Sequence, residues 1–221
     1  VFHRMIQTID GLLPDTDYEI MLVRANEASE TVTFHTEPEP ITLNVRDFGA
    51  FGDGAHDDTS AIQAAILCCP KNARVLISKG TYLVTALFLK SDMILELQEN
   101  AVLAGIYDRA RTPILPGQIE YDNEDGYYNL GSWEGNPIDS FASMITGIHV
   151  KNVTICGKGV LDGRADFENW WSRPKDKIRA WRPRMIFLNH CENIPVVGVT
   201  VQNSPAWNLH PLMCENVLVE E

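Results

Sequence analysis

Short runs in which apolar and polar residues alternate fill most of the chain after residue 73. Five such runs follow one another with only a few residues between them: 74–78, 80–84, 87–89, 93–97 and 101–104. Alternation with a period of two is typical of β-strands, and helical periodicity is absent from this region. The pattern therefore predicts an all-β domain, which is either a sandwich or a parallel β-helix.

A repeated motif distinguishes these two architectures. The segments 151–155, 192–196 and 215–219 share an Asn followed by Val or Ile at the next position and again two positions later, and Asn193 and Asn216 are 216 − 193 = 23 positions apart. That spacing is about one coil of a parallel β-helix. In such a coil the Asn side chains stack at a turn while the branched apolar residues fill the interior. We therefore interpret Asn152, Asn193 and Asn216 as structural residues.

One amphipathic helix is predicted near the start of this domain. The segment 44–66 reads as a strand, a glycine-rich turn, an Asp/Thr helix cap and a helix with Ile62 and Ile66 on one face. A phosphate-binding loop is excluded because the Gly-Lys-Ser/Thr ending is missing. An EF-hand is excluded because the acidic residues lack its spacing and its terminal Glu.

The first 38 residues follow a different pattern. A corner rich in Gly, Pro and Asp precedes alternation at Tyr18, Ile20 and Leu22, and a second strand is predicted over 31–36. These strands form a hairpin, which cannot bury enough surface to be stable alone. The Glu-Pro-Glu-Pro segment 37–40 is a stiff linker, so we divide the chain into domains 1–38 and 39–221.

The charge balance restricts the partners. The formal net charge is −12, which argues against a nucleic acid or an anionic membrane as a partner. No apolar run approaches the length of a membrane span, and no signal-peptide pattern opens the chain. The five cysteines lack metal-ligand spacing, so we expect neither a metal nor another cofactor, and we expect Cys68 and Cys69 to pack as small apolar residues.

Two long insertions carry opposite charge. The first, 107–140, holds seven acidic residues against Arg109 and Arg111. The second, 164–184, holds seven Lys and Arg residues, three acidic residues and three tryptophans. Arg binds carboxylates through two parallel hydrogen bonds, and flat indole rings offer faces to sugar rings. The basic insertion could therefore attract an acidic sugar chain, although a solvated loop whose tryptophans cover the coil is an equal alternative.

Two motifs resemble known families. The string D-F-G-A-F-G-D-G-A-H-D-D-T-S-A-I-Q-A-A-I at 47–66 resembles the start of pectin-lyase-like right-handed parallel β-helices, where the helix caps the open end of the coil. N-S-P-A-W-N-L-H-P at 203–211, followed by C-E-N-V at 214–217, resembles the polygalacturonases of glycoside hydrolase family 28. The order G-L-L-P-D-T-D-Y at 11–18 resembles the last part of a fibronectin type III sandwich, with Tyr18 as its tyrosine corner.

The polygalacturonase resemblance implies a hydrolase that cleaves α-1,4-galacturonosyl bonds in polygalacturonate or oligogalacturonides with inversion. The resemblance implies that its acids come from N-x-D, D-D and G-H-G blocks on coils beyond the N-S-P-x-W segment, and this chain has no Gly-His-Gly. We therefore expect no catalytic residue here and place these acids beyond residue 221. The pair Asp57 and Asp58 lies in the capping motif instead. We expect Arg184, Trp207 and His210 to bind the substrate, although a buried, hydrogen-bonded His210 is an equal alternative.

Further expectations follow from these resemblances. The insertion 107–140 could block one end of the groove and favour exo action. The resemblance suggests a secreted or periplasmic location, and the open end of the coil could pair with another chain. Two other functions remain open on the same fold: a polysaccharide-binding module without catalysis, and a polysaccharide lyase. The lyase would usually need calcium, for which the sequence offers no convincing ligand cluster.

Overall fold

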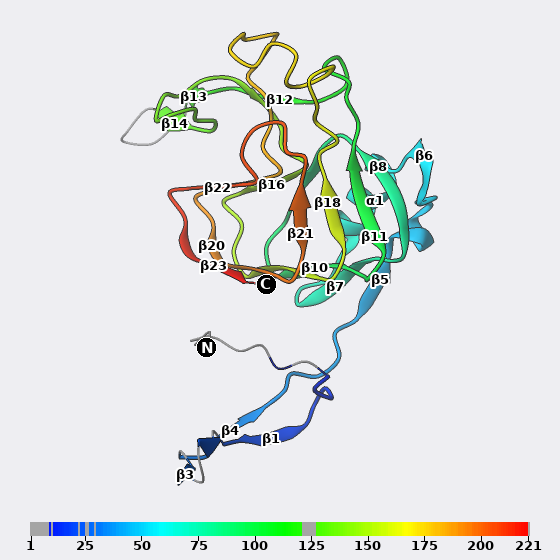
Figure 1. Cartoon of the computed structure of the whole chain (residues 1–221), viewed down its shortest axis with the longest axis vertical. Helices are drawn as coiled ribbons and strands as arrows, with labels where there is room; N and C mark the ends of the chain where they lie inside the picture. The colour runs from blue at the N-terminus through cyan, green and yellow to red at the C-terminus, as the bar shows by residue number, and fades with distance from the viewer. Residues whose placement is uncertain are drawn as a thin grey trace. The chain divides into compact units, whose positions relative to one another are not determined.

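The computed structural model describes residues 9, 11–21, 23–24, 27–28, 30–120 and 127–220. The chain divides into two compact units, Val1–Pro40 and Ile41–Glu221 (Figure 1). Some of the residues used above lie outside the described part of the chain. These are Leu22 of the predicted strand and three acidic residues of the first insertion, Asp122, Glu124 and Asp125.

The first unit contains the predicted hairpin. Strand β1 (Asp17–Ile20) pairs antiparallel with β4 (Val32–His35), and β2 (Val23–Arg24) pairs antiparallel with β3 (Glu27–Ala28). The ring of Tyr18 stacks on Phe34 at 5.7 Å, and the Tyr18 hydroxyl accepts a hydrogen bond from the backbone N–H of Leu13 at 2.7 Å. This contact fastens the Gly/Pro-rich corner to the first strand.

Three parallel sheets build the second unit, which confirms the predicted all-β, pectin-lyase-like parallel β-helix. The sheets contain the following strands in chain order. Sheet 1 contains β5 (Thr42–Asn44), β7 (Ala73–Ile77), β10 (Met93–Leu97), β17 (Val153–Gly157), β20 (Glu192–Val197) and β23 (Glu215–Glu220). Sheet 2 contains β6 (Asp53–Asp57), β8 (Gly80–Val84), β11 (Ala101–Gly105), β18 (Val160–Asp162) and β21 (Thr200–Gln202). Sheet 3 contains β9 (Leu87–Phe88), β16 (Ile145–Ile148), β19 (Ile186–Asn189) and β22 (Leu209–Leu212).

Alternating residues of these strands fill the interior of the coil. In sheet 1, Val75 pairs with Leu95, which pairs with Ile155, and all three side chains are fully buried. The register places the same kind of residue above and below each position, so the apolar side chains form layers across successive coils. The alternation of apolar and polar residues thus places the apolar side chains in the interior, as predicted.

The predicted asparagine ladder is present at the turn between sheets 3 and 1. The amide of Asn152 donates to the carboxylate of Asp92 at 2.8 Å, Asn193 donates to Asn152 at 3.0 Å, and Asn216 donates to Asn193 at 3.0 Å. All four residues have a φ between 54° and 60°, which is the left-handed region that Asn and Asp tolerate. One ladder of side-chain hydrogen bonds therefore links the turns of four successive coils.

The helix α1 (Thr59–Cys68) packs at the start of the coil, after the 3-10 turn η1 (Val45–Phe48). Ile62 and Ile66 are fully buried, as predicted. The side-chain amide of Gln63 donates to the carbonyl of Phe88 at 2.9 Å and accepts from its N–H at 2.8 Å. Since β9 is the first strand of sheet 3, Gln63 satisfies backbone groups of an edge that has no preceding strand.

The predicted helix cap needs a correction. Asp58 occupies the N-cap position, but its side chain makes no cap hydrogen bond. Its buried carboxylate accepts instead from the N–H groups of Phe51 at 2.6 Å and Gly52 at 3.1 Å. The carboxylate of Asp57 accepts a hydrogen bond from the N–H of Thr59 at 2.9 Å. Asp58 therefore holds the glycine-rich turn, and its neighbour caps the helix.

The two insertions follow β11 and β18 in sheet 2 and gather on the same side of the β-helix, beyond the ends of these strands (Figure 1). The first contains two short antiparallel pairs: β12 (Ile114–Leu115) with β15 (Ser140–Phe141), and β13 (Gln118–Glu120) with β14 (Tyr127–Asn129). The insertions also contact one another. The N–H of Phe141 donates to the carbonyl of Trp181 at 2.9 Å, and Lys177 forms an ion pair with Asp139 at 3.1 Å.

All five cysteines are free thiols. Cys69 is buried as predicted, whereas its neighbour Cys68 is exposed, so the prediction for that residue is wrong. Adjacent helical positions point in different directions, and only one of the two can face the core. Within the part of the chain that the structure describes, no helix is long and apolar enough to cross a membrane.

Candidate functional site

Three tryptophans from distant parts of the chain form one stack, which we call the tryptophan stack. Trp133 of the first insertion lies 5.1 Å from Trp181 of the second and 5.5 Å from Trp207, which precedes β22. The interplanar angles are 24° and 13°, so the rings are nearly parallel. Trp207 ends the stack and is 41% exposed. It therefore offers an indole surface to solvent.

Three arginines lie over aromatic rings of this region, Arg182 and Arg184 over rings of the stack and Arg109 over Trp170, and we call them the arginine layer. Arg184 is 1% exposed, and its guanidinium lies 5.3 Å from the ring centre of Trp133 and 5.6 Å from that of Trp207. Arg182 lies 4.0 Å from the ring centre of Trp171, and Arg109 lies 4.4 Å from that of Trp170. Cation–π contact compensates in part for the water that these groups have lost.

The hydrogen bonds of this layer go to neutral acceptors. Arg184 donates to the carbonyl of Ser132, and Arg182 donates to the carbonyls of Pro205 and Pro174. Several buried nitrogens have no acceptor: Nε and Nη1 of Arg109, Nε of Arg182 and Nε of Arg184. Among the described residues, no carboxylate pairs with any of the three guanidinium groups. The layer therefore carries positive charge without a carboxylate counter-ion from the part of the chain that the structure describes.

His210 completes the cluster. Its ring lies 4.8 Å from Trp207 at a right angle and 5.3 Å from Phe187, and its Nδ1 is buried without a hydrogen-bond partner. Burial, together with the charge of Arg184, lowers the pKa of His210 to about 4. Burial also lowers the pKa of Arg184 to about 10 and the pKa of Arg182. Burial disfavours the charged form of each group, and the positive charge of Arg184 adds to this effect at His210.

The structure thus brings together the three residues proposed from the sequence. Arg184, Trp207 and His210 are neighbours, although Arg184 is covered by aromatic rings and does not reach solvent. The sequence did not identify Trp133, Arg109 or Arg182 individually. Trp133 and Arg109 lie in an insertion that is acidic overall, so the net charge of that segment did not indicate that it contributes to a cationic surface. Only the contact between the two insertions shows that they belong to the same surface.

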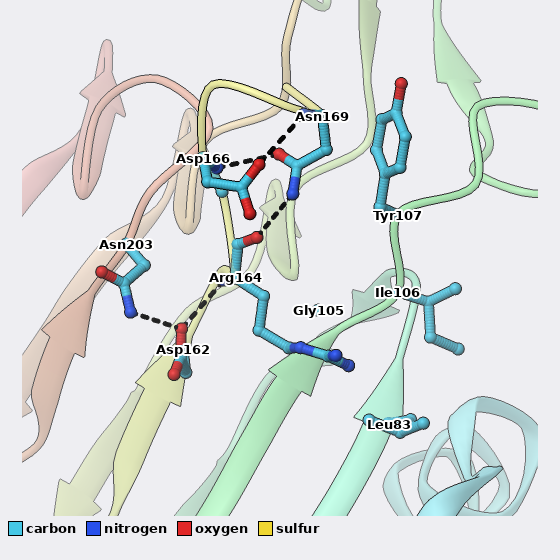
Figure 2. A pocket seen from close by; sticks show the side chains of 10 residues that line it. Leu83, Gly105, Ile106, Tyr107, Asp162, Arg164, Asp166, Asn169 and Asn203 are labelled. Carbon is cyan, nitrogen blue, oxygen red and sulfur yellow. Dashed lines mark hydrogen bonds between the residues drawn. The ribbon is translucent and has the colours of Figure 1, made fainter. Parts of the chain in front are cut away.

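A separate pocket lies where the strands of sheet 2 end (Figure 2). Its volume is about 570 Å³. Polar groups line it together with the apolar side chains of Leu83 and Ile106; the polar residues are Tyr107, Asp162, Arg164, Asp166, Asn169 and Asn203. Neither here nor elsewhere among the described residues do three or more His, Cys, Asp or Glu side chains gather in a group that could hold a metal ion.

Comparison with known proteins gives a consistent picture. Residues 42–210 match the family model described as rhamnogalacturonase A/epimerase, pectate lyase-like. An exo-poly-alpha-D-galacturonosidase of Dickeya chrysanthemi is 35% identical over 184 residues, which cover 79% of this chain and 29% of that protein. A probable polygalacturonase of Vitis vinifera is 29% identical over 181 residues, which cover 79% of this chain and 35% of that protein. The chain thus spans about a third of the length of these relatives.

Solved structures agree with the sequence relatives. A family 28 exopolygalacturonase of Yersinia enterocolitica superposes with a TM-score of 0.75 at 28% identity, over 96% of this chain and 44% of that one. A hyperthermoactive exopolygalacturonase of Thermotoga maritima superposes with a TM-score of 0.64 at 26% identity, over 82% of this chain and 47% of that one. The chain corresponds to less than half of either structure.

Proposed function

Because the chain belongs to the rhamnogalacturonase A/epimerase, pectate lyase-like family, we propose that it serves in hydrolysis of the α-1,4-galacturonosyl bonds of pectin-derived chains. The names of its relatives support this substrate, since the proteins of Dickeya chrysanthemi and Vitis vinifera are described as a galacturonosidase and a polygalacturonase. The observation that carries the proposal is the arginine layer, which holds charge without a carboxylate partner among the described residues.

A galacturonate residue matches this surface in two respects. Its carboxylate supplies the negative charge that the layer lacks, and one face of its ring can lie on the exposed indole of Trp207. In this proposal Trp207 contacts the sugar and His210 orients the indole through its edge contact. Arg184 acts through its charge, because its guanidinium lies under the rings. The net charge of −12 then ceases to conflict with an acidic substrate, since the binding surface is locally cationic.

Exo action, an inverting mechanism and an extracellular or periplasmic location complete the proposal. The contact between the insertions on one side of the β-helix, through Asp139 and Lys177, supports a groove closed on that side. We propose that the carboxylates of the reaction lie outside these 221 residues, because the chain corresponds to less than half of either exopolygalacturonase structure. Accordingly, the chain alone should release no reducing ends from polygalacturonate.

Two finer assignments also belong to this proposal. We assign Val1–Pro40 to the end of a fibronectin type III domain, with the bond from Leu13 N–H to the Tyr18 hydroxyl as its tyrosine corner. The boundary between the domains stays near residue 38. We further propose that these 221 residues, when studied alone, pair with another chain through β23, which has a neighbour on only one side among the described strands.

A binding experiment tests the substrate site. Calorimetry with α-1,4-digalacturonate should show binding to the unaltered chain that Trp207→Ala weakens about tenfold or more, the loss expected when one aromatic platform is removed. Phe167→Ala is the matched control, since Phe167 is an aromatic residue of the basic insertion that is 83% exposed and belongs to neither the tryptophan stack nor the arginine layer. Binding should also weaken as salt is raised, because the attraction to the arginine layer is screened.

Two results would overturn the proposal. Equal digalacturonate binding by the Trp207→Ala and Phe167→Ala variants would remove the tryptophan stack from the site. Release of reducing ends by the chain alone would show that the acids of the reaction lie within it.

A further inference from the structure

The pocket at the ends of the sheet 2 strands is distinct from the tryptophan stack, and we propose that it binds a neutral sugar unit. Its volume of about 570 Å³ lies within the range of sites for small molecules. Leu83 lies one residue before the end of β8, Gly105 ends β11 and Asp162 ends β18, so three consecutive coils supply the floor. The segments 105–107 and 164–169 supply the walls (Figure 2).

The wall 164–169 is held in place by its own hydrogen bonds. The side-chain amide of Asn169 donates to the carbonyl of Arg164 at 2.9 Å, and its oxygen accepts from the N–H of Asp166 at 2.9 Å. One carboxylate oxygen of Asp166 accepts from the N–H groups of Glu168 and Asn169. These bonds leave the shape of the pocket fixed before any ligand enters, which reduces the cost of binding.

Several polar groups remain for a ligand. The guanidinium of Arg164 crosses the floor toward Ile106 in Figure 2, and no hydrogen bond from it to another described residue is present. The second carboxylate oxygen of Asp166 and the hydroxyl of Tyr107 likewise have no partner among the described residues. Donors and acceptors therefore face the same cavity, together with apolar surface from Leu83 and Ile106. Sugars, with hydroxyls around an apolar ring face, need such a mixture.

Charge decides between a neutral and an acidic sugar. The pocket has two carboxylates, Asp162 and Asp166, against the single guanidinium of Arg164. Burial raises the pKa of Asp162, but hydrogen bonds from Asn203, the N–H of Arg164 and Gln202 outweigh burial and lower it, so this carboxylate is charged at neutral pH. A uronate would meet net negative charge here, whereas neutral hydroxyls can donate to both carboxylates. The preference is opposite to that of the arginine layer.

Packed side chains separate the pocket from the tryptophan stack. Buried Trp170 contacts Tyr107 edge-on at 5.3 Å on the pocket side. A cavity of only about 20 Å³ has walls from Ile106 of the pocket and from Arg184 of the layer. Such a volume holds about one water molecule and no sugar. A ligand can therefore occupy either place independently of the other.

Two probes that differ in their carboxylates test the proposal on the whole 221-residue chain: α-1,4-galactobiose and α-1,4-digalacturonate. The variant Ala165→Trp fills the pocket, because Ala165 lines it with a half-buried side chain. The variant Arg164→Asn removes the guanidinium and keeps a residue that tolerates the φ of 50° at this position. Lys175→Asn is the matched control, since Lys175 is an exposed cation of the same insertion that does not line the pocket.

The expected result in calorimetry is binding of galactobiose that both pocket variants weaken about tenfold or more, while Lys175→Asn and Trp207→Ala leave it unchanged. Digalacturonate should show the reverse sensitivity. Absence of galactobiose binding to the unaltered chain would overturn the proposal, as would equal binding by the Ala165→Trp variant. Loss of digalacturonate binding in Ala165→Trp but not in Trp207→Ala would assign the acidic sugar to this pocket instead. If only the proposed digalacturonate site at the tryptophan stack is wrong, the digalacturonate results will differ from these expectations and the galactobiose results will not.

Discussion

At the residue scale, the main feature is a set of buried cations that are compensated by rings rather than by acids. Arg184 is 1% exposed, and its environment consists of a backbone carbonyl and the faces of Trp133, Phe187 and Trp207. A buried charge without a counter-ion is costly, so such groups are retained mainly where they serve a ligand. The same positive charge acts on His210, which gives an observable titration.

The titration of His210 gives a prediction that does not depend on any ligand. Its pKa of about 4 lies below the ordinary value of 6.5 because of burial and the charge of Arg184. The folded chain therefore binds fewer protons than the unfolded chain between these values, and stability falls as pH decreases from about 6.5 to 4. The loss for this group is on the order of 2–3 kcal/mol. NMR titration of the His210 ring should report the low pKa, and His210→Gln should reduce the pH dependence of the urea midpoint.

His35 is the internal control for that titration. Hydrogen bonds from its ring to Asp17 and then to Asp15 raise its pKa above the ordinary value, so its NMR titration should shift in the opposite direction. An ordinary pKa for His210, with His35 shifted upward, would mean that water reaches the His210 ring freely. The arginine layer would then be better hydrated than the buried nitrogens indicate.

At the scale of elements, the turns between sheets 3 and 1 depend on side chains that repeat from coil to coil. Asp92, Asn152, Asn193 and Asn216 form a chain of hydrogen bonds in which each amide donates to the residue one coil before it. The direction of donation is fixed because the first member is a carboxylate, which can only accept when ionised. Lys71 pairs with the other oxygen of that carboxylate at 3.4 Å. The ladder therefore has a defined polarity.

Two isosteric substitutions distinguish the positions of this ladder. Asn152→Asp replaces the donor to Asp92 with a second carboxylate, so a hydrogen bond is lost and two negative charges meet. Asn193→Asp loses a donor to a neutral amide oxygen and creates no such pair. We expect Asn152→Asp to lower the free energy of unfolding by about 2 kcal/mol and Asn193→Asp by about 1 kcal/mol. Urea denaturation at pH 7 measures both, and equal losses would contradict the polarity of the ladder.

Much of this architecture could be predicted from local patterns. The alternating runs and the repeated Asn depend on neighbours in the same strand or one coil away, and the sequence records both spacings. Local patterns did not predict the role of Asp58, because its buried carboxylate accepts hydrogen bonds from the turn at Phe51 and Gly52 and does not cap the helix it precedes. The composition of a segment cannot reveal contacts between two insertions. Trp133 stacks on Trp181 although 48 positions separate them, and no periodicity marks such a pair.

At the scale of the whole molecule, charge is distributed unevenly. The chain carries −12, yet three arginines of the second unit share one aromatic cluster. Overall repulsion of an acidic polymer acts over about a Debye length, roughly 8 Å at physiological salt, whereas the arginine layer acts at contact. Digalacturonate should therefore bind through contacts at the arginine layer and not through long-range attraction to the whole chain.

The same net charge competes with attraction at the open end of the coil. Strand β23 pairs with β20 on one side only among the described strands, and Val219, opposite buried Val196, is 59% exposed. An unpaired strand edge beside exposed interior positions favours pairing with another chain. Repulsion between chains of charge −12 weakens as salt is added, so association should increase with both protein and salt concentration.

Val219→Lys tests this edge, because a lysine at an interior position of the last coil cannot be buried by an incoming chain without a partner. Leu218→Lys is the matched control: Leu218 is 47% exposed on the same strand, but it pairs with Pro195, which faces outward. Sedimentation velocity over a range of concentrations should show association of the unaltered chain, a much weaker association for Val219→Lys and a smaller change for Leu218→Lys. A single monomeric species at every concentration and salt would contradict pairing at this end. Equal effects of the two lysines would mean that charge at the edge, and not burial of the core, governs the association.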